Sequence, residues 1–308
     1  MTKVLHHNDN DGRCAAALIA AYLGSTSIVP KDFFEVDYNV DIDSIIHKVE
    51  KDETVWIVDF SLQPEMMTKL LDITSKVIWI DHHKSAIEKY KDFKLPEHLV
   101  TDMNNGEIAG IRSVEKSGCE LTAEYIAMCS GGDLFKETPE FVKLVGDYDT
   151  WQFKYGLTTE YFYYGVSVLG AGLWQVWPKL ILKGVTVEEV KNAGFFIHSY
   201  LQNQYKELAK RGVYPIEFHG YKGIALNTAQ LGSKQFEVIQ GVKDVDIMVP
   251  FFWNGKQWRV GVYSTNPHID CSAICTQYGG GGHKAAAGFF TDNIPHELFE
   301  STGETVEV

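Results

Sequence analysis

The stretch VLHHNDNDGRCAAALIAAYL, residues 4–23, joins an apolar run, a polar cluster and an Ala-rich segment. The apolar run predicts a short strand, and the residues after Gly12 place small and large apolar side chains at helical spacing. Between these two elements, positions 6–11 hold two histidines and two aspartates. The stretch therefore predicts a strand that ends in metal-capable side chains and leads directly into a helix.

The same alternation continues through the first ninety residues. Apolar runs predict further strands over 32–38, 54–60 and 76–80, and helical patterns cover 41–51 and 64–74. Acidic residues suit the start of the first of these helices, and a proline suits the first turn of the second. Strands and helices at this spacing predict an α/β fold with a mainly parallel sheet and crossover helices.

Metal-capable side chains follow three of the four predicted strands. They are His7, Asp9, Asp11, Asp59, Asp81, His82 and His83. The carboxyl ends of parallel strands meet in one crevice, so we expect these side chains to converge there. Asp147 and Asp149 close a later predicted helix and add two more carboxylates.

Carboxylates and neutral imidazoles together suit divalent first-row ions such as Mn²⁺, whereas thiolate-rich sites suit Zn²⁺. The number of candidates is about what two ions that share a carboxylate need. Two metals ~3.5–4 Å apart clamp the attacking and leaving oxygens of a phosphoryl displacement. The pattern therefore favours a two-metal site for phosphoryl chemistry.

Composition limits the class of protein. The 308 residues suffice for two domains, and the apolar content of 45% is typical of a globular chain. A net charge of −13 disfavours a long track along duplex nucleic acid, although bound cations could still attract a small anion. The five cysteines form no CxxC pair and are expected to pack as small apolar residues.

Neither a signal peptide nor a membrane span is expected. The first residues turn polar after two apolar positions, and the uncharged stretch 161–178 contains glycines, tyrosines and Gln175. A buried or aromatic-faced helix is the preferred interpretation of that stretch. We therefore expect a cytoplasmic location and no membrane partner.

The sequence pattern changes from helical to β-rich near residue 212. Helical patterns extend to that point and β-rich runs follow, with the hairpin signal WNGKQW at 253–258. We predict a metal-binding domain over 1–190, a helical connector over 191–212 and a smaller α/β domain over 213–308. The GGGGH run, 279–283, is expected to be an irregular loop whose amides contact phosphate, with KAAAGF, 284–289, as a helix or turn.

Five motifs together resemble those of the DHH phosphoesterase superfamily. In family order they are HNDNDG at 7–12, IVDFS at 57–61, IDHHKS at 80–85, GDYDTW at 146–151 and YGGGGHKAAAGF at 278–289. The last motif is similar to the glycine-rich signature of the DHH-associated C-terminal domain. The resemblance covers nearly the whole chain and implies the nanoRNase and oligoribonuclease-like branch.

The resemblance implies two Mn²⁺ ions, with Mg²⁺ or Co²⁺ as substitutes. It assigns His7 and Asp9 to one ion and Asp11 to the other, with Asp59 as the bridge. His82 would complete the ligands with Asp147 or Asp149; Asp147 is preferred, with Asp149 in support. Asp81 and His83 would be catalytic, with His83 at the substrate phosphate or leaving group.

The resemblance also implies that the second domain binds the substrate. The substrate-binding residues would be Gly281, Gly282 and His283, together with Ser264. Related domains often place an arginine before this serine, where the chain has Tyr263. Lys284 is equally consistent with a phosphate contact and with a solvated lysine.

The function implied is a Mn²⁺-dependent phosphodiesterase that releases 5′-mononucleotides from short RNA or linear dinucleotides. Three alternatives stay open: a phosphatase for a small phosphorylated metabolite or nucleotide, a single-strand exonuclease, and a binding protein with a degenerate site. The expected partner is the short RNA or dinucleotide, without long duplex nucleic acid. A homodimer is left open.

Overall fold

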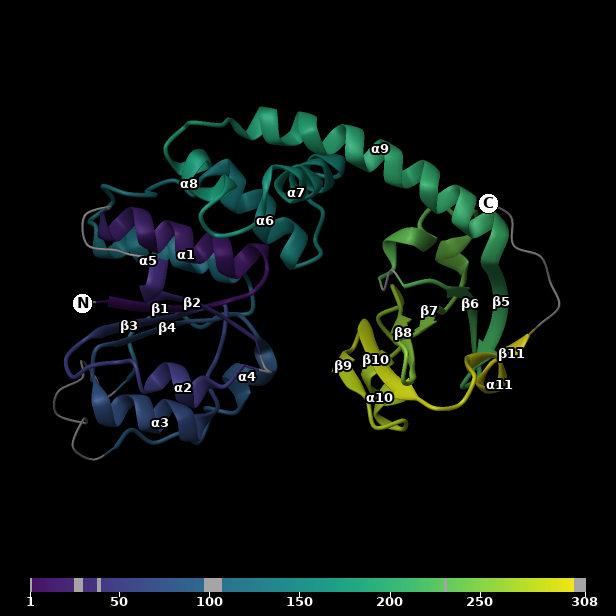
Figure 1. Ribbon diagram of the computed structural model, residues 1–308, viewed down its shortest axis with the longest axis horizontal. Coiled ribbons are helices and arrows are strands. Elements are labelled where there is room, and N and C mark those ends of the chain that lie inside the picture. The colour runs from purple at the N-terminus through teal and green to yellow at the C-terminus, as the bar shows by residue number, and fades with distance from the viewer. Residues whose placement is uncertain (1, 25–29, 38–39, 97–106, 230–231, 302–308) are drawn as a thin grey trace. The chain divides into compact units, whose positions relative to one another are not determined.

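The computed structural model describes residues 2–24, 30–37, 40–96, 107–229 and 232–301 (Figure 1). The chain divides into two compact units, Met1–His198 and Ser199–Val308. The division lies within one continuous helix, α9 (Val187–Gly212). Among the described helices, none has the length and apolar character that a bilayer crossing requires.

The first unit contains a parallel four-stranded sheet in the order β2-β1-β3-β4. Its strands are β1 (Thr2–His7), β2 (Phe33–Val36), β3 (Thr54–Val58) and β4 (Val77–Ile80). The helices between and after them are α1 (Asn10–Leu23), α2 (Ile42–Ile46), α3 (Pro64–Ile73) and α4 (Lys84–Glu88). The predicted parallel sheet with crossover helices is confirmed, while residue 38 of the strand predicted over 32–38 lies outside the described residues.

Both faces of this sheet are covered by helices, α1 and α5 (Gly118–Cys129) on one side and α2 and α3 on the other (Figure 1). Trp56 and Val58 of β3 pack in the core that includes α1 and α5. Val55 and Ile57 of the same strand pack in the core that includes α2 and α3. Alternate residues therefore enter opposite cores, which explains why β3 is apolar throughout its length.

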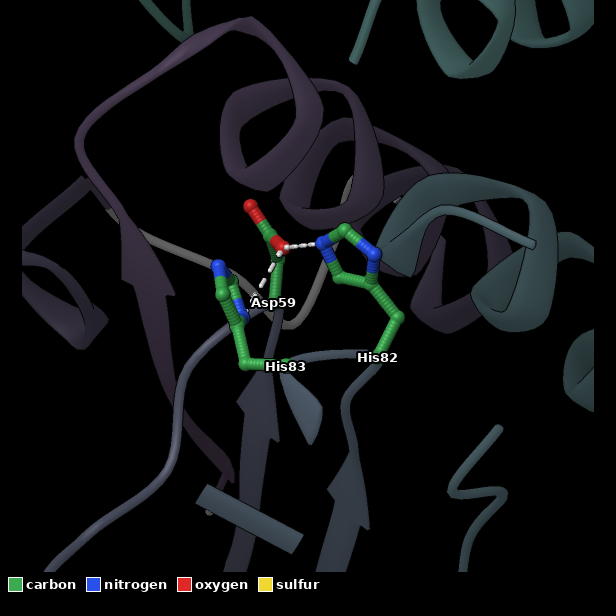
Figure 2. Close-up of side chains that lie close together, drawn as sticks. All are labelled: Asp59, His82 and His83. Atoms are coloured by element: carbon green, nitrogen blue, oxygen red, sulfur yellow. Dashed lines mark ion pairs between the residues drawn. The ribbon is translucent and has the colours of Figure 1, made fainter. Parts of the chain in front are cut away.

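The carboxyl ends of β3 and β4 lie next to each other at one edge of the sheet (Figure 2). Asp59 directly follows β3, and His82 and His83 follow β4. Asp59 has a φ of 54°, in the left-handed region that costs a non-glycine residue conformational energy. This backbone turn is one of the features that place the carboxylate beside the two imidazoles.

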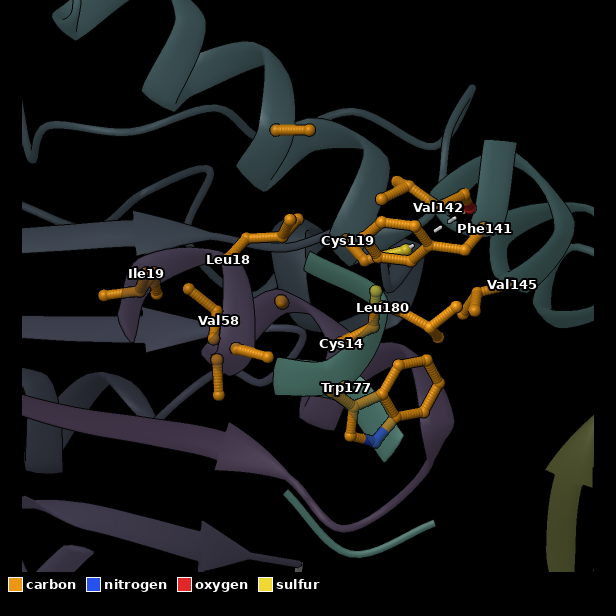
Figure 3. Close-up of a cluster of buried hydrophobic side chains, with 14 of the residues drawn as sticks. Cys14, Leu18, Ile19, Val58, Cys119, Phe141, Val142, Val145, Trp177 and Leu180 are labelled. Atoms are coloured by element: carbon orange, nitrogen blue, oxygen red, sulfur yellow. Dashed lines mark hydrogen bonds between the residues drawn. The ribbon is translucent and has the colours of Figure 1, made fainter. Parts of the chain in front are cut away.

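The core on the α1 side also receives α6 (Glu140–Asp149), α7 (Leu157–Leu169) and α8 (Val176–Ile181) (Figure 3). Cys14 and Cys119 are fully buried in it. Cys271 and Cys275 are buried in the second unit, while Cys129 is exposed, and all five thiols are free. The predicted packing role of the cysteines is therefore confirmed for the four buried ones.

The second unit contains a seven-stranded sheet in the order β11-β5-β6-β7-β8-β10-β9. The strands are β5 (Val213–Phe218), β6 (Tyr221–Asn227), β7 (Ile247–Trp253), β8 (Trp258–Tyr263), β9 (Gly281–His283), β10 (Ala286–Thr291) and β11 (Glu300–Ser301). The short helices are α10 (Cys271–Thr276) and α11 (Pro295–Leu298). All neighbouring strands are antiparallel except β6 and β7. The hairpin predicted at WNGKQW is confirmed by β7 and β8.

The glycine run differs from the prediction. Gly281–His283 form the edge strand β9. The predicted helix or turn is a turn at Lys284 and Ala285 only, and Ala286–Thr291 form the strand β10. A Cβ atom on Gly280 would lie 2.2 Å from the carbonyl oxygen of Gly288, and one on Gly282 would lie 2.6 Å from the Cα of Ala287. Because these glycines have no side chain, their backbone can lie close to β10. The hydrogen bonds of the strand pair offset the conformational entropy that the glycines lose on folding.

Candidate metal centre

One group of ligands lies where β1 turns into α1. The Nδ1 atom of His7 lies 2.6 Å from Oδ2 of Asp9 and 3.7 Å from Oδ2 of Asp59. Asp9 is also the N-cap of α1, since its Oδ1 accepts a hydrogen bond of 2.9 Å from the amide of Gly12. Burial opposes ionisation of Asp9, but the contact with His7 outweighs it and lowers the pKa of Asp9 to about 2.

A second group lies between α1, the end of β4 and the end of α6. The Nε2 atom of His82 lies 3.3 Å from Oδ2 of Asp149 and 3.9 Å from Oδ2 of Asp11. Asp11 is held from behind by the N-terminus of α5, where the amides of Gly118 and Cys119 donate to its oxygens at 2.6 and 3.0 Å. Burial lowers the pKa of His82, which favours the neutral imidazole that metal coordination requires.

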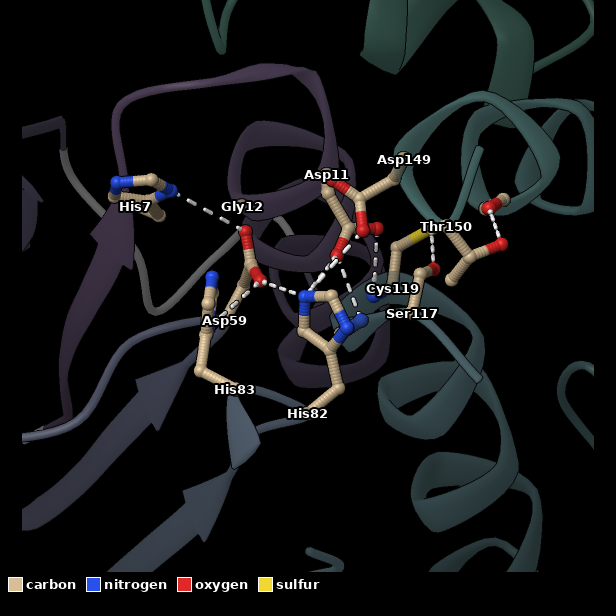
Figure 4. A network of polar contacts seen from close by, with 12 residues as sticks. His7, Asp11, Gly12, Asp59, His82, His83, Ser117, Cys119, Asp149 and Thr150 are labelled. Carbon is tan, nitrogen blue, oxygen red and sulfur yellow. Dashed lines mark hydrogen bonds and ion pairs between the residues drawn. The ribbon is translucent and has the colours of Figure 1, made fainter. Parts of the chain in front are cut away.

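Asp59 connects the two groups (Figure 4). Its Oδ2 faces His7, and its Oδ1 lies 3.2 Å from Nε2 of His82. Three sets of donor atoms lie close enough to hold a metal ion: Asp59 with His82 and His83; His7 with Asp9 and Asp59; and Asp11 with His82 and Asp149. Asp59 belongs to two of these sets and lies beside His82, a member of the third.

The polar atoms at the centre are buried without hydrogen-bond partners among the described residues. They are both carboxylate oxygens of Asp59, Nε2 of His82 and Oδ2 of Asp149. Burial, together with neighbouring carboxylates such as Asp11, raises the pKa of Asp59 and of Asp149 well above the ordinary value. Divalent cations would relieve both the missing bonds and the repulsion, so this donor set fits metal ions.

Asp81 and His83 form a separate pair beside this centre. Asp81 is fully buried, and one of its oxygens accepts from the Ser61 hydroxyl. Its other oxygen accepts from the amides of His82 and His83 and lies 2.7 Å from Nδ1 of His83. Burial lowers the pKa of His83, but the Asp81 carboxylate outweighs it and leaves that pKa raised. Asp81 thus orients His83, whose Nδ1 proton it accepts.

Asp147 lies apart from the metal-capable groups. Its carboxylate accepts from the amides of Lys154 and Tyr155, at 2.8 and 3.2 Å, and from the Thr159 hydroxyl. These contacts hold the turn that follows α6. We therefore propose Asp149 as the ligand and Asp147 as the supporting residue, the reverse of the order that the sequence favoured.

The predicted substrate contacts of the second unit lie on β9 and just after β8. Gly281 and Gly282 are exposed on the edge strand. Ser264 is buried, and its hydroxyl donates to the carbonyl oxygen of Asp246 at 2.6 Å and accepts from the amide of Asn266. That hydroxyl has a structural role, and the assignment of Gly281, Gly282 and His283 to substrate stays a prediction.

Sequence reasoning missed the residues that support the centre. Gly118 packs so closely that a Cβ atom there would lie 2.6 Å from Cβ of Asp59 and 3.0 Å from Oδ2 of Asp11. The helix that contributes these amides starts with a capping box formed by Ser117 and Glu120. The Ser-x-x-Glu spacing is a signal for such a start and could have identified this support.

This geometry defines a class of protein: an α/β domain that gathers carboxylates and imidazoles able to hold metal ions at the carboxyl edge of a parallel sheet. Residues 2–145 match the DHH family, N-terminal domain. Over these residues, close to half of the chain, the first unit is similar to that family's N-terminal domain.

One curated protein is similar in sequence over most of the chain. The uncharacterized protein R106 of Acanthamoeba polyphaga mimivirus is 26% identical over 268 residues, which cover 82% of this chain. The chain spans 58% of the length of that curated relative.

Two solved structures show the same fold at low sequence identity. The pGpG-specific phosphodiesterase PggH of Vibrio cholerae has a TM-score of 0.54 at 14% identity, covering 95% of this chain and 94% of its own. An exopolyphosphatase-related protein of Bacteroides fragilis has a TM-score of 0.53 at 16% identity, covering 96% of this chain and 88% of its own.

Proposed function

We propose that this chain is a Mn²⁺-dependent phosphodiesterase that cleaves short oligonucleotides or linear dinucleotides to 5′-mononucleotides. The observation that carries the proposal is the position of Asp59. Its two oxygens are buried, make no hydrogen bond to the residues that the structure describes, and face different groups of ligands. A carboxylate in that position is suited to bridge two cations.

The proposed ligands divide into two sets around that bridge. His7 and Asp9 would hold one ion with Asp59, and Asp11, His82 and Asp149 would hold the other. Mixed oxygen and imidazole donors can hold Mn²⁺, as they can other divalent first-row ions. When bound, the pair would supply electrostatic stabilisation for the oxygens of a phosphate under attack.

The residues of the chain supply orientation and proton transfer. Asp81 accepts the Nδ1 proton of His83, so Nε2 of that ring would be the atom that meets the substrate. The raised pKa of His83 favours the protonated ring, and a protonated imidazole can donate to the leaving oxygen. The amides of Gly118 and Cys119 keep Asp11 in place while charge redistributes.

Short substrates are proposed on two grounds. The net charge of −13 disfavours long polyanions, which need an extended basic surface. The Vibrio protein of the same fold is specific for pGpG, so this fold can serve a linear dinucleotide.

The test is hydrolysis of a labelled RNA series, from the dinucleotide to long oligomers, in the presence of Mn²⁺. Pyrophosphate and a simple aryl phosphate are assayed in parallel. Asp59→Asn removes the bridging charge, and Asp43→Asn, on an exposed aspartate paired with Lys69, is the matched control. Rapid loss of the shortest oligomers by all proteins except Asp59→Asn supports the proposal. Turnover of the aryl phosphate alone would contradict it and indicate a small-metabolite phosphatase.

A further inference from the structure

A cavity of about 220 Å³ adjoins the proposed metal ligands within the first unit. Its polar lining includes Asp9, Asp11 and Asp149. Its aromatic lining includes Tyr148, Trp151 and Tyr163. Among the described residues that line this aromatic cavity there is no lysine or arginine. One end of the cavity therefore carries the proposed metal ligands. The other end is aromatic, and its described residues offer no lysine or arginine side chain to a phosphate.

The aromatic rings are arranged as a stack with one ring set across it. Tyr148 and Tyr163 are stacked, with ring centroids 3.7 Å apart and planes inclined by 6°. Trp151 meets Tyr148 at 5.3 Å with an interplanar angle of 73°. Two rings nearly at right angles form a corner, where a flat ligand ring can stack on one and meet the other edge-on.

The turn that carries Trp151 is strained and held in place. Trp151 and Phe153 have φ values of 55° and 49°, which bulky residues rarely adopt. The contacts of the Asp147 carboxylate with the amides of Lys154 and Tyr155 secure this turn. Trp151 stays 49% exposed in spite of its size. Strained backbone conformations cluster at ligand sites, so this turn is a candidate for contact with a ligand.

We propose that the aromatic cavity receives the base of the nucleotide whose phosphate lies at the metal ligands, with Trp151 as the principal stacking residue. This inference rests on the proposed phosphodiesterase function and adds to it the part of the site that would distinguish nucleotides from other phosphate esters. The cavity is smaller than the pockets that hold drug-sized ligands, and this size suits a single ring system. Stacking tolerates any base, because every base has a π-face.

An aromatic base site would affect which class of substrate the protein prefers. A base-bearing nucleotide gains contacts that pyrophosphate, polyphosphate or a sugar phosphate cannot make. The aromatic end also offers no lysine or arginine to a second phosphate among the described lining residues. The enzyme should therefore prefer nucleotide esters over base-free phosphates that have the same scissile bond.

The experiment compares a dinucleotide with the same dinucleotide lacking its bases, both with Mn²⁺. The measured quantity is the ratio of kcat/KM for the base-bearing substrate to that for the abasic one. We expect Trp151→Ala to lower this ratio about tenfold and Trp151→Phe to retain most of it. Trp174→Ala is the control, since Trp174 is 45% exposed and packs against Phe33 outside the cavity. An equal ratio in all four proteins would overturn the inference.

A binding measurement separates this inference from the proposed function. AMP and ribose 5-phosphate are titrated calorimetrically into the protein with Ca²⁺ present. We expect AMP to bind about tenfold more tightly, with the difference lost in Trp151→Ala. If neither dinucleotide is cleaved but this preference is found, the proposed hydrolysis fails and the base site stands. Equal affinities for the two ligands would overturn the base site, whatever the activity.

Discussion

The Oδ1 atom of Asp59 lies 3.2 Å from Nε2 of His82, and neither atom makes a hydrogen bond among the described residues. Each unsatisfied buried polar group costs about 1–3 kcal/mol of stability. The first unit therefore carries a destabilised centre when no cation is bound. Binding of Mn²⁺ should recover that free energy, which makes the stability of the protein a direct readout of the site.

The stability of the metal-free protein should fall as pH rises. The pKa values of Asp59 and Asp149 are raised in the folded state, chiefly by burial. A raised carboxyl pKa contributes stability that is present below the unfolded value of about 4 and is lost as pH rises through the folded value. Bound Mn²⁺ favours the charged carboxylates, so the increase in Tm on adding Mn²⁺ should grow from about pH 5 to about pH 8.

Thermal denaturation with and without Mn²⁺ measures this effect. The pKa of Asp9 shifts the other way, to about 2, and lies below the pH range of the test. Asp59→Asn should flatten the pH dependence, because the amide does not titrate. A Tm increase that is constant across the range, or that shrinks with pH, would contradict the assignment of these carboxylates.

His82 and His83 are neighbours with different predicted roles. His82→Ala removes a ligand, so the number of Mn²⁺ ions bound per chain should fall, and activity with it. His83→Ala should keep the bound ions and lower kcat by about 10²- to 10⁴-fold, as is usual when a general acid is removed. Metal analysis and steady-state kinetics on the same preparations make the comparison. Loss of metal in both variants would assign His83 to the ligands instead.

Gly118 should be intolerant of any side chain. A Cβ atom there would lie 2.6 Å from Cβ of Asp59, so Gly118→Ala must displace the proposed bridge. We expect Mn²⁺ affinity to fall by about 10- to 100-fold, the range seen when support of a metal ligand is removed. Gly184→Ala is the matched control, since its nearest neighbouring atom would be 3.7 Å away. Calorimetric titration of Mn²⁺ gives both affinities, and equal values would show that the contact is not critical.

Two adjacent glycines of β9 should behave differently. Gly282 has a φ of 144° and would place a Cβ atom 2.6 Å from Cα of Ala287, whereas a Cβ on Gly281 would meet nothing within 4 Å. Gly282→Ala should lower the free energy of unfolding by about 1–3 kcal/mol, and Gly281→Ala by no more than about 0.5 kcal/mol. Denaturant titration of both variants provides the check. A large loss in Gly281→Ala would contradict the described pairing of β9 with β10.

Much of the first unit could be predicted because the local residue preferences and the parallel order of the strands indicate the same structure. The strand ends carry the polar residues, and Pro64 occupies the first turn of α3 as its fixed φ allows. The parallel order then brings Asp59 and His82 together without any further assumption. Metal chemistry could be inferred because so many of its donor residues end adjacent strands.

Other features could not be predicted because they depend on tertiary contacts, which the spacing of residues along the sequence does not reveal. Asp147 and Asp149 lie two positions apart on α6, about 200° around the helix, so only the rotation of that helix decides which one faces the metal centre. Gly118 reaches Asp11 across 107 positions. The glycine run was predicted to be irregular from its chain entropy alone, which omits the pairing with β10.

The number and coupling of bound Mn²⁺ ions test the central claim most directly. Calorimetric titration gives the stoichiometry, and electron paramagnetic resonance reports whether the two ions share a bridging ligand. We predict two Mn²⁺ per chain with a spin-coupled signal, and loss of that coupling in Asp59→Asn. A single ion per chain, or two ions with uncoupled signals in the unaltered protein, would contradict the assignment of Asp59 as the bridge.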